Sequence, residues 1–139
     1  MTLLLRGLLA VIGFAVIWLG LNVSLGGIET LGWQGAANFF TVTEATTFAV
    51  QDNHVRFIAG VWTGVGVFLL AGAAIPHRLS PVLKAMMVLV FIGGLARLTV
   101  LDSAVLTSAE VAPSLVAELL LFPLLGWWIH KTNWDTSDG

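Results

Sequence analysis

Three ionisable side chains lie inside strongly apolar stretches of this chain: Arg56, Arg97 and Glu118. An unpaired charge near the middle of a membrane helix costs about 2.5–3.5 kcal/mol, and less near a helix end. Each of the three lies about one helical turn from the end of its own stretch, within roughly 8 Å of the same predicted boundary. We therefore expect Glu118 to pair with Arg97, with Arg56 or with both, since pairing relieves that cost.

Further polar residues lie just beyond the same boundary and could extend the cluster. The candidate ligand-binding site consists of Arg56, Arg97, Glu118, Asn53, Asp52, His54 and Asp102. Three interpretations are open, in this order of preference. The first is an ion-pair clasp that fixes the register of the helices, or simple snorkelling of long side chains to the interface. The second is a pocket for an anionic or polar head group, and the third is proton or acid–base chemistry at Glu118.

The elements that must position these residues are four apolar segments, at about residues 3–21, 54–74, 82–101 and 114–129. About 20 apolar residues span a bilayer core as a helix. The fold class predicted is therefore all-α, a four-helix transmembrane bundle in a single domain over residues 1–131, followed by a polar tail over residues 132–139. The first segment is interpreted as a retained span, because its apolar run exceeds the roughly 7–15 residues of a signal-peptide core.

Irregular features are expected at three places. Residues 22–53 should form an interfacial helix and loop between the first two spans. This expectation rests on large apolar residues at near-helical spacing and on the aromatic residues that follow them: Leu25, Ile28, Leu31 and Trp33, then Phe39, Phe40 and Phe48. Residues 75–81 should form a tight turn, with Pro81 opening the third span. Pro123 should kink the fourth span.

Small residues in two of the spans are typical of close helix packing. Gly60 and Gly64 have the four-residue spacing common in membrane bundles, and Gly93 and Gly94 offer a partner surface. We expect this packing to lie within the chain, and a dimer face is the alternative.

Composition agrees with a membrane protein and excludes several other classes. Hydrophobic residues make up 58% and charged residues 10% of the 139 residues, whereas soluble domains carry about 25% charge. The net charge of −2 includes no basic run, which disfavours a nucleic-acid partner. There is no cysteine, so disulfides and thiol chemistry are excluded.

The basic residues predict an orientation. With a cytoplasmic N-terminus, Arg6, Arg78, Lys84 and Lys131 all fall on the cytoplasmic side. The long loop over residues 22–53 contains neither Lys nor Arg, as expected of an external loop. Both termini are therefore predicted to be cytoplasmic.

Metal, haem or another cofactor is not predicted, and no catalytic residues are assigned. His54 is expected at the outer face, whereas His77 and His130 are expected at the inner face, so the histidines do not meet at one depth. A nucleophile–base set, a glycine-rich phosphate loop and paired carboxylates are not visible in the sequence.

Two short patterns carry a resemblance to a known family. Arg56-Phe57-x-x-Gly60 in the second span is followed by Gly93-Gly94-x-x-Arg97-Leu98 in the third, and Glu118 comes early in the fourth. In these features the chain resembles a family of small bacterial four-span proteins classified as a domain of unknown function. The resemblance implies a protein of the bacterial inner membrane. Small multidrug transporters are also short four-span proteins, but they place their key glutamate in the first span, where this chain has no acidic residue.

The function predicted is that of a non-enzymatic membrane protein that binds a lipid or small amphiphile at an outward-facing polar site, or that serves as a subunit of a membrane complex. The alternative is a small membrane enzyme or transporter with Glu118 as its ionisable centre. The expected partners are the lipid bilayer, a lipid-like ligand and either further copies of the chain or a larger membrane complex.

Overall fold

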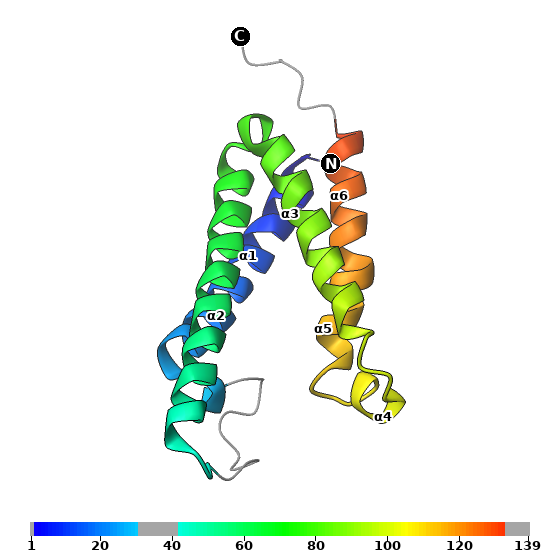
Figure 1. Cartoon of the computed structure of the whole chain (residues 1–139). Coiled ribbons are helices and arrows are strands. Elements are labelled where there is room, and N and C mark those ends of the chain that lie inside the picture. Colours follow the sequence, from blue (N-terminus) through cyan, green and yellow to red (C-terminus); the bar gives the residue numbers. More distant parts are fainter. Residues whose placement is uncertain (1, 31–41, 133–139) are drawn as a thin grey trace. The chain divides into compact units, whose positions relative to one another are not determined.

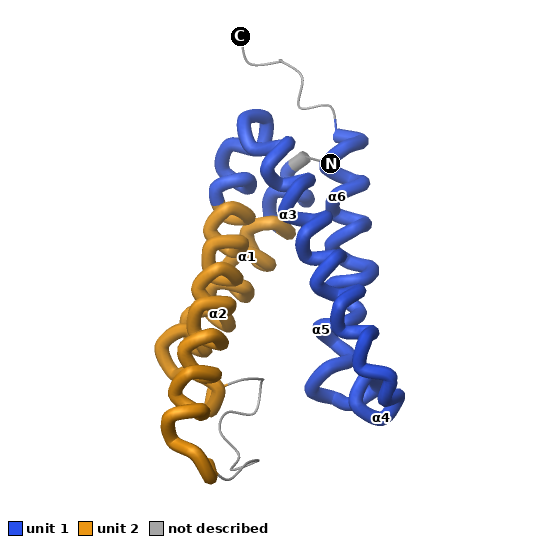
Figure 2. The backbone as a smooth tube through the Cα atoms, in the orientation of Figure 1, with its two compact units in different colours: residues 1–7, 71–139 blue, residues 8–70 orange. Residues whose placement is uncertain are grey.

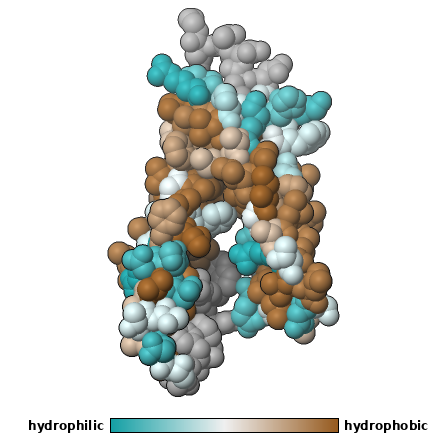
Figure 3. All heavy atoms as spheres, in the orientation of Figure 1, coloured by the Kyte–Doolittle hydropathy of each residue, from teal (hydrophilic) through white to brown (hydrophobic). Residues whose placement is uncertain are grey.

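Four long apolar helices dominate the computed structural model, which describes residues 2–30 and 42–132 (Figure 1). The helical segments long and apolar enough to cross a membrane are Leu3–Gly26, Ala45–Ala74, Pro76–Arg97 and Ala112–Lys131. Apolar side chains cover the middle of the helices, and hydrophilic ones gather toward their ends (Figure 3). The predicted all-α fold with four candidate spans is confirmed.

The chain divides into two units, residues 8–70 (unit 2) and residues 1–7 with 71–139 (unit 1), each described here by itself (Figure 2). In unit 2, α1 (Thr2–Gly26) and α2 (Ala45–Ala74) run antiparallel. Their backbones approach closely at glycines: a Cβ on Gly66 would lie 2.8 Å from the carbonyl oxygen of Gly13, and one on Gly20 would lie 2.8 Å from the amide nitrogen of Thr63. Small residues permit this contact between helix backbones.

The glycines that make this contact are not the pair predicted from spacing. A Cβ on Gly60 would meet only the Ser24 hydroxyl, at 3.9 Å, and one on Gly64 would meet no described atom within 4 Å. Within unit 2, Gly66 faces α1 because it lies two residues beyond Gly64, on another side of the helix.

In unit 1, α3 (Pro76–Arg97) packs against α6 (Phe122–Lys131). The two helices are joined through the short helices α4 (Ser103–Leu106) and α5 (Ala112–Val116) and a π-helical turn, η2 (Ala117–Leu121). The apolar core repeats at helical spacing on both partners. Its buried side chains are Leu83, Met87 and Val90 on α3 with Phe122, Leu125 and Ile129 on α6.

The π turn accounts for the irregularity expected at Pro123. Proline has no N–H, so the Leu119 carbonyl loses the donor that an α-helix would supply four residues later. The structure widens the helix directly before this proline, over residues 117–121, and α6 begins at Phe122. A π turn of this kind often marks a functional position, and Glu118 lies in it.

Several helix ends differ from the segment bounds predicted from hydropathy. The helix α2 begins at Ala45, nine residues before the start predicted at His54. Its first turns are helical but polar, so hydropathy did not reveal them. The helix α3 begins at Pro76, so the turn expected over residues 75–81 is only a break at Ile75. The same helix ends at Arg97, four residues before the predicted end of the third span. Pro76, rather than Pro81, occupies the favourable first position, and Pro81 lies inside the helix.

Only the two ends of the predicted interfacial segment between the first two spans belong to the described residues. Leu25 belongs to the last turn of α1, Ile28 opens a single 3₁₀ turn, η1 (Ile28–Thr30), and Phe48 lies on α2. Leu31, Trp33, Phe39 and Phe40 lie outside the described residues.

An arginine caps the C-terminus of α2 in unit 1. The Arg6 Nε donates to the Ala73 carbonyl at 2.7 Å, and its Nη2 donates to the Ala74 carbonyl at 3.2 Å. The last carbonyl groups of a helix have no partner within the helix, and a cation there also interacts favourably with the helix dipole. Arg6 therefore has a structural role at the end of α2.

Candidate functional site

The ion pair expected between the third and fourth spans is present in unit 1. Arg97, the last residue of α3, places its Nε 2.8 Å from Oε2 of Glu118 in η2. The glutamate side chain is only 10% exposed, whereas the arginine side chain is 45% exposed. The pair therefore joins a buried carboxylate to a guanidinium that reaches the surface.

A glycine one turn before Arg97 allows this contact. A Cβ on Gly94 would lie 2.8 Å from Cβ of Glu118 and 2.9 Å from Cδ2 of Leu119, so η2 packs directly on the α3 backbone. Gly94 and Arg97 are three residues apart and share one helix face. The Gly-Gly-x-x-Arg pattern thus has a structural reason: its second glycine admits the π turn, and its arginine meets the glutamate.

The geometry of the pair leaves hydrogen-bonding capacity unused. Although Oε2 of Glu118 is close to Arg97 Nε, it receives no hydrogen bond of acceptable angle, so the contact is an ion pair by distance. Within residues 2–30 and 42–132, the Arg97 side chain forms no hydrogen bond and no ion pair other than the one with Glu118. The outer nitrogens of this guanidinium can therefore donate to a ligand, and a guanidinium fork matches carboxylate and phosphate groups.

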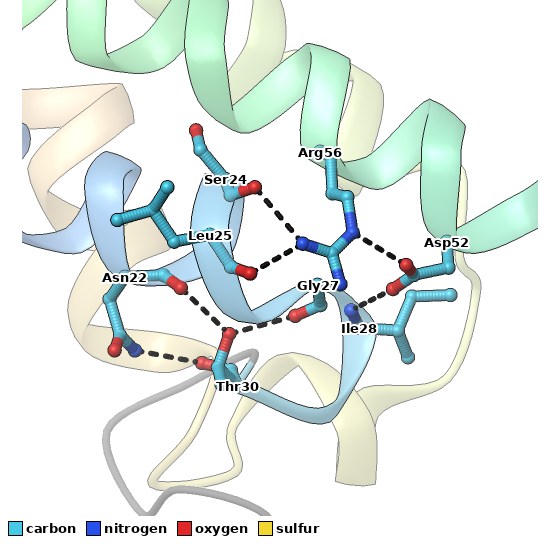
Figure 4. Close-up of polar contacts among 8 residues, drawn as sticks. All are labelled: Asn22, Ser24, Leu25, Gly27, Ile28, Thr30, Asp52 and Arg56. Atoms are coloured by element: carbon cyan, nitrogen blue, oxygen red, sulfur yellow. Dashed lines mark hydrogen bonds and ion pairs between the residues drawn. The ribbon is translucent and has the colours of Figure 1, made fainter.

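Arg56 has a carboxylate partner of its own in unit 2. Its Nε donates to Oδ2 of Asp52 at 2.6 Å, and its Nη1 donates to the carbonyl groups of Ser24 (3.3 Å) and Leu25 (Figure 4). Oδ1 of Asp52 accepts from the Ile28 amide at 2.7 Å. Together Arg56 and Asp52 satisfy backbone groups at the end of α1, as capping side chains do.

Gly27 completes this end of α1, although it is not among the predicted site residues. Its φ of +76° is a left-handed conformation that favours glycine, and its amide donates to the Val23 carbonyl at 2.7 Å. A Cβ there would also overlap Oδ1 of Asp52. The sequence signal for this helix end is the Gly26-Gly27 pair, because a glycine just after the last helical residue is a common helix stop.

The other predicted site residues, Asn53, His54 and Asp102, belong to neither of these two ion pairs. Asn53 and His54 are exposed on α2. Asp102 caps α4, because its Oδ1 accepts from the Ala104 amide at 2.9 Å. Two grooves in unit 1 are lined by other residues, and no member of the predicted cluster lines either one.

We expect Arg56→Ala to loosen the end of α1. The substitution leaves the Ser24 and Leu25 carbonyls without their donor, and charge-assisted hydrogen bonds of this kind are among the stronger ones. Amide hydrogen exchange at residues 26–28 should become roughly tenfold faster. The control is His54→Ala, which removes an exposed side chain two residues away. Equal exchange in both variants would show that Arg56 does not cap α1.

The four apolar helices define a multi-pass integral membrane protein. A sequence model of the family described as "Domain of unknown function (DUF4345)" matches residues 4–129, which is most of the chain. The protein therefore belongs to this family, in agreement with the resemblance seen in its Arg-Phe-x-x-Gly and Gly-Gly-x-x-Arg-Leu patterns. No curated protein and no solved structure matches the chain.

Proposed function

We propose that this membrane protein binds an amphiphile with an anionic head group through Arg97, with Glu118 as the residue that positions the guanidinium. The observation that carries the proposal is the asymmetry of the ion pair, a side chain 10% exposed anchoring one that is 45% exposed. A carboxylate buried that far holds the Nε side of the guanidinium and leaves the other side open to a ligand. Asp52 and Arg56 serve as a structural cap in this proposal.

The surroundings of Arg97 suit an amphiphile better than a water-soluble anion. Large apolar side chains close in sequence to the two members of the pair are exposed: Leu95 and Leu98 beside Arg97, and Leu121 three residues after Glu118. Exposed apolar surface beside a cation offers a hydrocarbon chain and a charged head group their preferred contacts at once.

We also propose the orientation that the basic residues indicate, with both termini on the cytoplasmic side of a bacterial inner membrane. This orientation would put Arg97 and Glu118 near the outer leaflet. It follows from the distribution of Arg6, Arg78, Lys84 and Lys131 relative to the four helices.

The experiment is a titration of the purified protein in neutral detergent with dodecyl phosphate and with the zwitterionic dodecylphosphocholine. Arg97→Gln should weaken binding of dodecyl phosphate about tenfold or more, the effect of losing a charge-assisted hydrogen bond. Arg78→Gln, which removes an exposed arginine near the start of α3, is the matched control. Unchanged affinity in Arg97→Gln would refute the proposal.

Glu118→Gln separates the binding proposal from its two competitors. A folded Glu118→Gln protein with weakened binding supports a positioned guanidinium. A protein that loses thermal stability but keeps its affinity indicates a purely structural clasp. The alternative function, a small enzyme or transporter centred on Glu118, is favoured by the burial of Oε2 without a hydrogen bond. It requires that Glu118→Gln abolish turnover or flux while the affinity for dodecyl phosphate stays unchanged.

A further inference from the structure

A second feature of unit 1 lies apart from the ion pair, in a groove of about 330 Å³ between α3 and α6. This volume falls at the lower end of the range of small-molecule sites. One face of each helix lines it, with residues 84, 87, 88 and 91 on α3 and residues 123, 126, 127 and 130 on α6. Both sets have the same helical spacing, and seven residues of helix correspond to about 10 Å of groove.

The walls of the groove are apolar and open toward the outside of unit 1. Met87 lies at the close approach of the two helices, where a Cβ on Gly126 would be 3.1 Å from Cβ of Met87. Val88 and Trp127 flank the groove and are 56% and 61% exposed. In a membrane-spanning pair of helices, such side chains face acyl chains, so hydrocarbon has access to the groove.

One end of the groove is basic. Lys84 is the first of the lining residues on α3 and His130 is the last on α6, and the antiparallel packing brings them to the same end. Across the described part of the chain, neither side chain forms an ion pair. The adjoining groove also ends at a basic residue, Lys131, and shares the wall formed by Trp127.

We infer that this groove binds an anionic phospholipid, with an acyl chain between α3 and α6 and the phosphate at Lys84 and His130. An apolar groove that ends in a lysine and a histidine complements a molecule with an apolar tail and a negative head group. Basic sites between membrane helices are known to select such head groups, and a tryptophan at the mouth suits the interface. This site is independent of the one proposed at Arg97.

The test is native mass spectrometry of the full chain in neutral detergent, titrated with phosphatidylglycerol or with phosphatidylcholine. The wild type should bind phosphatidylglycerol more tightly than phosphatidylcholine. Lys84→Ala should weaken phosphatidylglycerol binding about fivefold, the effect of one lysine near an anionic surface, and leave phosphatidylcholine unchanged. Arg78→Ala removes a cation outside the groove and should change neither.

A second pair of variants tests the groove itself. Val88→Trp should fill it and weaken the binding of both lipids, whereas Leu89→Trp, at an equally exposed neighbour outside the groove, should not. The proposal is overturned if Lys84→Ala binds phosphatidylglycerol as the wild type does, or if inorganic phosphate competes as well as the lipid. It is also overturned if the wild type is a dimer that Val88→Trp dissociates, because a second copy would then occupy the groove.

Discussion

Gly94→Leu should destabilise the protein by about 3 kcal/mol, at the upper end of the usual cost of overpacking a core. The reason is the packing of α3 against η2, where even a Cβ would lie 2.8 Å from Cβ of Glu118 and 2.9 Å from Cδ2 of Leu119. The first of these atoms is fixed to its backbone, so the helices themselves would have to separate. Unfolding in mixed micelles with increasing sodium dodecyl sulfate measures this loss.

The neighbouring glycine supplies a matched control. A Cβ on Gly93 would meet no described atom within 4 Å, and Gly93 is exposed. Gly93→Leu adds the same side chain to the same helix, one residue away, and should leave the unfolding midpoint within about 0.5 kcal/mol of the wild type. Equal losses in the two variants would mean that α3 and η2 do not pack as described.

Arg97→Ala should cost about 2 kcal/mol of unfolding free energy. Removing one partner of a buried pair typically costs about 3–5 kcal/mol, because the other charge remains buried and unpaired. The loss expected here is smaller because the arginine side chain is 45% exposed and partly screened by its surroundings. Glu118→Gln should cost less than Arg97→Ala, since it removes the buried charge itself.

The control for this prediction is Arg78→Ala, measured in the same mixed micelles. Arg78 is exposed and has no ion-pair partner among the described residues, so its loss should leave stability nearly unchanged. Should Arg97→Ala prove as stable as Arg78→Ala, the ion pair with Arg97 would not be needed to keep the Glu118 carboxylate buried.

Hydropathy alone predicted the four spans, because membrane helices leave a strong signal in composition and length. The cost of burying charge then pointed to a partner for Glu118, and the structure shows Arg97 at 2.8 Å. Each of these inferences needed only the residue type and its depth along a helix. They required no knowledge of which helix faces meet.

Features that depend on the side of a helix or on backbone shape were not predictable in this way. Spacing favoured Gly60 and Gly64 for packing, but Gly66 makes the contact with α1, because two residues of helix turn the side chain to another face. An ion pair between Arg56 and Glu118 was one of the expected options, but the observed hydrogen bonds of Arg56 are those that cap α1 together with Asp52. Such a cap depends on where α1 ends, and helix ends are the least certain part of a sequence-based prediction.

The most direct test of the site is a double-mutant cycle between Arg97 and Glu118. It consists of the unfolding free energies of the wild type, Arg97→Gln, Glu118→Gln and the double variant in one detergent system. A contact at 2.8 Å with one buried member predicts a favourable coupling of about 1–2 kcal/mol, so the double variant should lose less than the sum of the two single losses. Strictly additive losses would show that the two side chains act independently. Glu118 would then not position the Arg97 guanidinium for a ligand.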